Sequence, residues 1–146
     1  MHSAPCSNLY LERCIPLLVQ QNVYSGKYEN DFFNRSWAEF KVGFNDTEGN
    51  YWLGNDLLSQ LTMSGRYKLK FDLQSRSSGK CYYAEYSTFY VFGETTNYLM
   101  HSAGYSGNAG RDSLAVQNGM MFTTYDRDND RRSGNCAALM KSGFWF

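Results

Sequence analysis

Residues 66–73 alternate polar and apolar side chains without a break, and this alternation constrains the fold more than any other feature of the sequence. Side chains two residues apart share one face of a β-strand. The pattern therefore predicts a half-buried strand with Tyr67, Leu69, Phe71 and Leu73 on its inner face.

Further strands are expected after this one. A polar turn over residues 74–79 leads to aromatic stretches at 82–86 and 89–92, which together predict an antiparallel hairpin. Residues 98–100 are expected to form another short strand, and residues 104–110 a glycine-rich loop. That loop lacks the Gly-Lys-Ser/Thr sequence of a phosphate-binding loop, so nucleotide binding is not expected.

A short helix is predicted before the alternating segment. Asn34 or Ser36 can cap its N-terminus, and Gly43 ends it. Three aromatic residues recur at helical spacing and are expected on its inner face: Trp37, Phe40 and Phe44.

A second helix is expected to begin near Asp56 and to end at Ser64 or Gly65. We interpret the Asp56 carboxylate as an N-terminal cap and not as a catalytic group. Three leucines are placed on its inward face: Leu57, Leu58 and Leu61.

Composition narrows the possible functions. The protein has 146 residues, the size of one domain, with 14 basic and 14 acidic side chains and no net charge. Because the sequence has no basic stripe, neither a nucleic-acid partner nor binding to a charged membrane surface is expected. Membrane insertion is not expected either, because no stretch approaches the roughly 20 apolar residues of a membrane span. The 12 Tyr, 10 Phe and 3 Trp suit a tyrosine-rich β core or a surface that faces carbohydrate.

Three carboxylates stand on alternate residues at Asp126, Asp128 and Asp130, among residues that favour turns. Such oxygens can converge on Ca²⁺. An EF-hand is excluded, because its sixth and twelfth positions would be Arg131 and Ala137. The alternative is a solvated loop in which neighbouring arginines neutralise the carboxylates.

Four phrases of the sequence carry a resemblance to a known family. They are DFFNRSWAEFKVGF (31–44), YWLGND (51–56), YSGNAG (105–110), and MMFTTY followed by GNCAA (120–138). Together they resemble the fibrinogen-related domain, the C-terminal globular module of fibrinogen chains, ficolins, tachylectins, angiopoietins and tenascins. The resemblance implies an α+β fold: a twisted antiparallel sheet with short flanking helices and a loop-rich, calcium-binding C-terminal subdomain.

The resemblance covers residues 30–146, which we interpret as a partial domain truncated at both ends, and leaves residues 1–29 unassigned. Residues 23–28 could form a strand. An early core strand of the family is not recognised, and a deletion near residues 25–30 would explain this.

The resemblance also implies a calcium site. The ion would be held by the side chains of Asp128 and Asp130 and by the backbone carbonyls of Arg132 and Gly134. Asp126 would lie next to these ligands without binding the ion itself. In lectin-like members an acetyl group binds beside the calcium in an aromatic pocket. Met140 stands at the position of a tyrosine expected in that pocket. The other ligand-binding residues are unknown.

Four cysteines are present, and three disulfide connectivities are open for them: Cys6, Cys14, Cys81 and Cys136. In the family the counterpart of Cys136 pairs with a later cysteine that this sequence does not contain. Cys136 is therefore expected to be free or mispaired. Cys81 is expected to be a thiol.

The resemblance implies a secreted, calcium-dependent recognition module, lectin-like and specific for acetylated glycans in innate defence. Two alternatives remain: a matrix or growth-factor type of module that binds extracellular proteins, and a truncated fragment that binds nothing. A longer form would be multimeric, and its signal peptide is not in this sequence. Asn34 and Asn45 stand in glycosylation patterns.

No enzyme is expected. We interpret His101 as a structural residue, and Glu85 and Asp112 have no visible partner.

Overall fold

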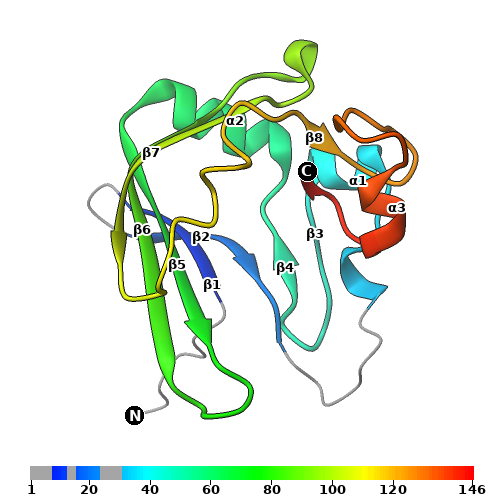
Figure 1. Ribbon diagram of the computed structural model, residues 1–146. Coiled ribbons are helices and arrows are strands. Elements are labelled where there is room, and N and C mark those ends of the chain that lie inside the picture. Colours follow the sequence, from blue (N-terminus) through cyan, green and yellow to red (C-terminus); the bar gives the residue numbers. More distant parts are fainter. Residues whose placement is uncertain (1–7, 13–15, 24–30) are drawn as a thin grey trace.

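The computed structural model describes residues 8–12, 16–23 and 31–146. Its main element is a seven-stranded antiparallel sheet with the strand order β3-β4-β2-β1-β5-β6-β7, and β8 and β9 form a second, two-stranded sheet (Figure 1). The strands are β1 (Asn8–Glu12), β2 (Pro16–Gln21), β3 (Phe44–Asn45), β4 (Tyr51–Trp52), β5 (Tyr67–Gln74), β6 (Cys81–Val91), β7 (Met100–Gly107), β8 (Phe122–Thr123) and β9 (Phe144–Trp145). The helices are α1 (Trp37–Val42), α2 (Asn55–Ser64) and α3 (Cys136–Met140), with 3₁₀ turns η1 (Asp31–Phe33) and η2 (Glu94–Thr96). The predicted α+β class is confirmed.

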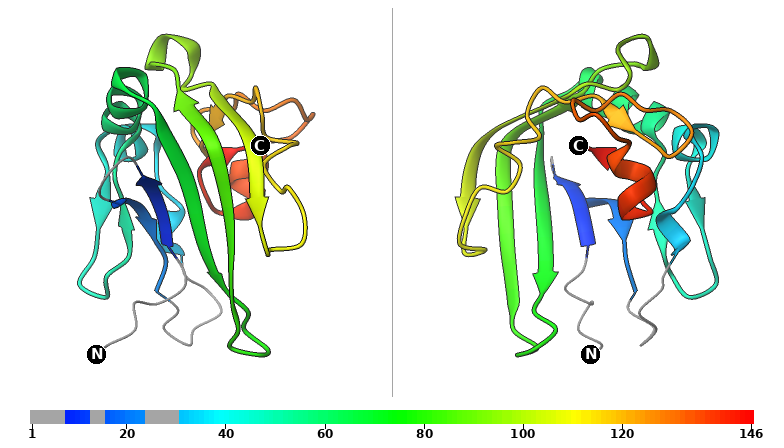
Figure 2. Two further views of the ribbon diagram at one scale, coloured as in Figure 1. Left: turned by 90° about the vertical axis from the view of Figure 1, so that its left-hand side faces the viewer. Right: turned by 45° about the vertical axis from the view of Figure 1, so that its right-hand side comes forward.

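The β5–β6 hairpin follows the predicted alternation. Leu69 is 1% exposed and pairs with Tyr86, which is 2% exposed. The two aromatic stretches after the turn form one long strand, β6. Leu73 is 44% exposed, because the hairpin extends beyond the elements that would cover it (Figures 1 and 2).

The predicted strand at residues 98–100 is wrong in position. Asn97 and Tyr98 have φ values of 53° and 51°, so the backbone turns there and the strand begins only at Met100. It continues to Gly107, so it takes up residues 104–107 of the segment predicted to be a loop, and residues 108–110 lie outside it. Pairing with β6 provides hydrogen-bond partners for the backbone N–H and C=O groups of this segment. This is why a glycine-rich sequence is extended here.

Helix α1 begins as predicted, with Ser36 as its cap. The Ser36 side chain and Glu39 form a capping box, and Trp37 and Phe40 are buried. Gly43 ends the helix at φ 95°, and a Cβ there would lie 2.7 Å from the Leu53 carbonyl oxygen. Only glycine allows this approach between α1 and the β4–α2 connection.

The prediction that Asp56 caps α2 is wrong. Gly54 occupies the cap position without a side-chain bond, and Asp56 instead accepts a 2.5 Å hydrogen bond from the Tyr98 hydroxyl. Leu58 is fully buried and Leu61 packs against the core, as predicted, but Leu57 is 44% exposed. The buried side of the helix is partly polar. It contains three residues that were not predicted there: Asn55, Ser59 and Thr62.

The core is aromatic where the two sheets meet. Phe122 of β8 is fully buried, with ring centroids at 5.1 Å from Phe40, 6.1 Å from Trp52 and 4.9 Å from Trp145. The Trp145 indole donates a 2.7 Å hydrogen bond to the Tyr98 carbonyl. The last residues of the sequence are therefore part of the core.

Strands β1 and β2 lie within the segment that the sequence patterns left unassigned. β1 pairs with both β2 and β5, and Leu11 and Val19 are fully buried, so this segment supplies two strands of the main sheet. The possible strand at residues 23–28 falls mostly outside the described residues.

The expectation that Cys81 is a thiol is wrong. This first residue of β6 is disulfide-bonded. Its side chain is exposed at the start of β6. Cys6 and Cys14 lie outside the described residues.

Candidate calcium loop and recognition surface

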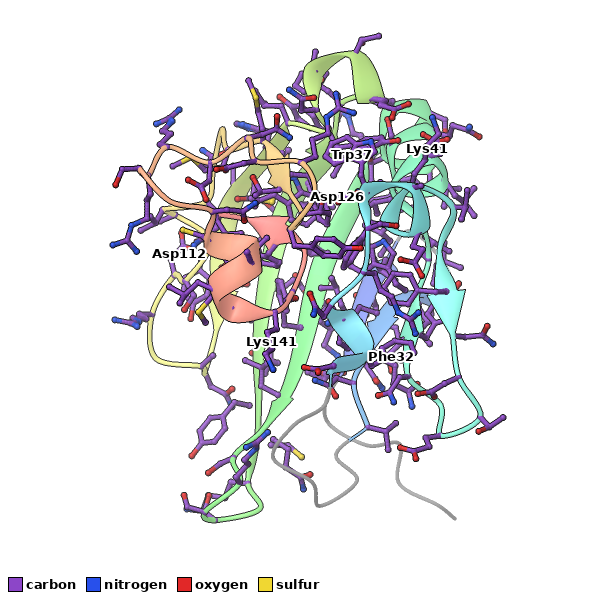
Figure 3. The ribbon with its side chains drawn as sticks, turned by 90° about the vertical axis from the view of Figure 1, so that its right-hand side faces the viewer. Phe32, Trp37, Lys41, Asp112, Asp126 and Lys141 are labelled. Atoms are coloured by element: carbon purple, nitrogen blue, oxygen red, sulfur yellow. The ribbon has the colours of Figure 1, made fainter. Side chains whose placement is uncertain are left out.

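The loop between β8 and α3 is fixed to the core at its start. Asp126 Oδ1 accepts hydrogen bonds from the Trp37 backbone N–H at 2.9 Å and from the Thr124 hydroxyl at 2.8 Å. Figure 3 shows Asp126 beside Trp37, at the N-terminus of α1. A carboxylate at the first turn of a helix is favourable both as an acceptor and for the helix dipole.

Arg127 extends this attachment. Its guanidinium carbon lies 4.1 Å from the centroid of the Trp37 ring, and the guanidinium donates a 2.8 Å hydrogen bond to the Asn97 side-chain oxygen. The Trp37 indole in turn donates to Glu94, which also pairs with Lys41. Hydrogen bonds from Lys41 and Trp37 hold the pKa of Glu94 below its ordinary value.

The predicted ligand Asp130 is held by the backbone of its own loop. Its Oδ1 accepts from the Arg132 N–H at 2.7 Å, and its Oδ2 from the Cys136 N–H at 2.8 Å. Burial raises the pKa of Asp130, but these two donors outweigh it, and the pKa lies below its ordinary value. Asp128, the other predicted ligand, is exposed and accepts a 3.2 Å hydrogen bond from the Asp130 N–H.

Two asparagines that the sequence patterns did not single out shape the loop. Asn129 donates a 2.8 Å hydrogen bond to the Phe122 carbonyl. Asn135 caps α3 by accepting from the Ala138 N–H at 2.9 Å, and it donates to the carbonyls of Thr124 and Tyr125. Asparagine is a preferred residue at a helix N-terminus, so Asn135 could have been found from the sequence.

The chemistry of this loop fits Ca²⁺. The predicted donors are hard oxygens, and Asp130 is kept ionised by neighbouring N–H groups. Within the described ranges, no three or more His, Cys, Asp and Glu side chains gather as a metal cluster. A site of two carboxylates and two carbonyls, as the resemblance implies, uses fewer such side chains, and the assignment of Asp128, Asp130, Arg132 and Gly134 remains a prediction.

Helix α3 follows the loop and presents an apolar surface. Cys136 and Ala137 face the core, whereas Leu139 is 77% exposed and Met140 is 64% exposed. Cys136 is a free, buried thiol, one of the two states expected for it. Burial and the Asp130 carboxylate raise its pKa, so it is kept as the neutral thiol.

The remaining candidate residues have structural contacts. His101 stacks on Tyr90 with 4.7 Å between ring centroids. Glu85 pairs with Lys68 at 3.0 Å, and Asp112 accepts a 2.8 Å hydrogen bond from the Tyr86 hydroxyl. Two further candidates, Asn34 and Asn45, are exposed, and their glycosylation stays a prediction.

Comparison with known proteins gives the same family. The family model of the C-terminal globular domain of fibrinogen beta and gamma chains matches residues 17–146, and this protein belongs to that family. Over 114 residues it is 42% identical to human angiopoietin-2, covering 78% of this sequence and 23% of that protein. It is 38% identical to human ficolin-3 over 116 residues, covering 80% of this sequence and 38% of that protein. The sequence thus spans less than two fifths of the length of either relative.

Solved structures confirm the fold. The fibrinogen-like globe domain of human ANGPTL2 has a TM-score of 0.75 and 34% identity, covering 96% of this protein and 70% of that one. Lamprey fibrin D-dimer, solved with the peptide ligand Gly-His-Arg-Pro-amide, has a TM-score of 0.69 and 26% identity, covering 98% of this protein and 54% of that one.

The family consists of binding modules and not of enzymes, in agreement with the structural contacts of His101, Glu85 and Asp112. In the part of the protein that the structure describes, no helix has the length and apolarity to span a bilayer.

Proposed function

We propose that this protein is a calcium-dependent recognition module that acts outside the cell and binds a protein ligand through the surface next to its calcium loop. The ion would be held by Asp128, Asp130 and the carbonyls of Arg132 and Gly134. It would brace the loop and, through Asn135, the helix that carries the recognition surface.

The exposed apolar side of α3 is the observation that carries this proposal. Leu139 and Met140 are both more than half exposed on a helix of five residues, and Tyr125, next to the same loop, is 47% exposed. Exposed large apolar and aromatic side chains are typical of surfaces that bind proteins. The similarity to angiopoietin-2 supports the same interpretation.

The second candidate is recognition of acetylated glycans, with ficolin-3 as the relative that favours it. A flexible thioether at position 140 gives a sugar no flat ring to stack on. We therefore rank it below protein recognition.

The calcium site is tested first, by thermal unfolding in saturating Ca²⁺ and in chelator. A site filled at about 100 times its dissociation constant adds about 2.7 kcal/mol, a shift of about 5 to 15 °C for a protein of this size. We expect Asp128→Asn to lose this shift and Glu48→Gln to keep it, since Glu48 lies in the exposed turn between β3 and β4. An equal shift in all three proteins would contradict the assignment.

The ligand class is tested by two immobilised partners, an N-acetylglucosamine resin and a panel of extracellular receptor domains, both with Ca²⁺ present. Protein recognition predicts that Leu139→Gln with Met140→Gln abolishes binding to a receptor domain. Retention on the resin that free acetate reverses, and that these substitutions leave intact, would support glycan recognition instead.

A further inference from the structure

Arg127 directly precedes Asp128, a predicted calcium ligand, and its side chain is directed away from the loop. Its guanidinium carbon lies 4.1 Å from the centroid of the Trp37 ring, and the guanidinium donates a 2.8 Å hydrogen bond to Asn97. One of its nitrogens lies 3.7 Å from a carboxylate oxygen of Glu94. Among the described residues, no ion pair joins Arg127 to a carboxylate of its own loop. The guanidinium therefore attaches the loop to the body of the protein.

The Trp37 ring is a rigid support for this contact. It is 7% exposed, and its centroid lies 5.3 Å from that of Tyr98 and 6.2 Å from that of Phe122. Its indole N–H donates a 2.7 Å hydrogen bond to Glu94. A guanidinium that lies over a ring fixed on several sides is fixed in turn, and so is the backbone that carries it.

The backbone of Arg127 is also fixed. Its N–H donates to the Thr124 carbonyl at 3.1 Å, and its own carbonyl accepts from the Thr124 N–H at 3.0 Å. On the other side of Asp128, the Asn129 side chain donates to the Phe122 carbonyl at 2.8 Å. Asp128 itself is exposed, so its position depends on these two neighbours.

The charge and the position of Arg127 have opposite effects on a bound cation. A positive charge beside the loop repels Ca²⁺, so removal of the charge alone tightens calcium binding, by about twofold at physiological ionic strength. A loop that is correctly arranged for only part of the time binds more weakly, in proportion to that fraction. Loss of a stacked guanidinium and its hydrogen bond is sufficient to lower the fraction about tenfold.

We propose that Arg127 is a positioning residue for calcium. By stacking on Trp37 it holds the loop in the arrangement that binds the ion, and this gain exceeds the repulsion between its own charge and Ca²⁺. This role rests on the calcium site of the proposed function.

Isothermal titration of the 146-residue protein with CaCl₂ tests the proposal. Arg127→Ala should bind calcium about fivefold more weakly, because a tenfold loss of order is partly offset by a twofold gain from the removed charge. Arg127→Lys keeps the charge but loses the planar group, and it should bind about threefold more weakly. Repulsion alone predicts the opposite for alanine, tighter binding, and an unchanged affinity for lysine.

Arg131→Ala is the matched control, because Arg131 lies in the same loop and is not a predicted ligand. Its side chain is exposed, and none of the ion pairs found in the described part of the protein uses it. Its removal should tighten calcium binding by up to about twofold, in the opposite direction to Arg127→Ala. Circular dichroism in chelator checks that every variant is folded.

A second measurement needs no calcium. Trypsin cleaves after arginine, and Arg132 is exposed in this loop. The rate of cleavage at Arg132 in chelator reports how often the loop opens. We expect this rate to rise about tenfold in Arg127→Ala and to stay the same in Arg131→Ala.

Calcium binding by Arg127→Ala as tight as that of the unaltered protein, or tighter, would overturn the proposal. Cleavage of its loop at an unchanged rate would do the same. Absence of calcium binding by the unaltered protein would overturn the calcium site itself, and the role of Arg127 with it.

Discussion

The aromatic core and the loop from Asp126 to Asn135 meet at Trp37, but they are stabilised in different ways. Phe122 is fully buried among other rings, and its contribution comes from removal of apolar surface from water. The loop is largely exposed, and its order comes from carboxylate and amide side chains that accept from and donate to the backbone. The core should therefore tolerate changes of solution conditions, whereas the loop depends on charge and so on pH and cations.

The largest effect is expected from emptying the core. Phe122→Ala should lower the free energy of unfolding by about 3 to 5 kcal/mol, because it removes a buried ring and leaves a cavity. Urea denaturation measures this. Phe122→Leu is the control and should cost about 1 kcal/mol. An alanine variant as stable as the leucine one would show that the core collapses around the gap.

Alkaline pH tests the buried tyrosines at the edge of the core. Burial raises the pKa of Tyr86 to about 12, so its neutral form stabilises the folded state fully below about pH 10, and this stabilisation is lost as the pH rises through about 12. The loss should be on the order of 2 kcal/mol in urea denaturation. Tyr86→Phe should show a smaller loss over the same range; the same loss would assign the effect to other groups.

The junction between the two regions is tested at Asp126. Asp126→Ala removes the acceptor for the Trp37 N–H and the Thr124 hydroxyl and should cost about 1 to 2 kcal/mol in chelator. Asp126→Asn keeps an oxygen in the same place and should recover most of this. Thermal unfolding separates the two. If asparagine is as damaging as alanine, the charge and not the hydrogen bond fixes the loop.

The smallest effect on stability is expected on the exposed side of α3, at Leu139 and Met140, where we propose that a protein ligand binds. Leu139→Gln should change the free energy of unfolding by less than about 0.5 kcal/mol, because the side chain is 77% exposed. The same variant should weaken binding to a protein ligand in a titration. A large loss of stability would mean that Leu139 is covered in solution.

Local signals in the sequence predicted the local structure well. Ser36 and Glu39 specify the start of α1 by themselves, since a capping box needs only residues three apart. The strand at residues 67–74 was likewise predictable, because its alternation has a period of two. Several separate motifs indicate the family, and the match to the family model confirms it.

Predictions failed where a residue's environment comes from distant parts of the sequence. The position of Asp56 near the start of α2 predicts a helix cap, but Tyr98, 42 residues later, provides its hydrogen bond. The apolar character and spacing of Leu57 and Leu73 predict that both are buried, but each is 44% exposed, because no element of the described structure covers it. The local sequence does not indicate strands β1 and β2, because their pairing with β5 and β4 depends on residues far away in the sequence.

The sequence by itself determined the secondary structure of its strongly patterned segments, the family, and the oxygen-rich chemistry of the loop. Only the tertiary structure decided which apolar side chains remain exposed, that Asp126 joins the loop to α1, and that Arg127 stacks on Trp37. The reason is physical: caps and alternation act over a few residues, whereas burial and long-range hydrogen bonds depend on which segments the fold brings together.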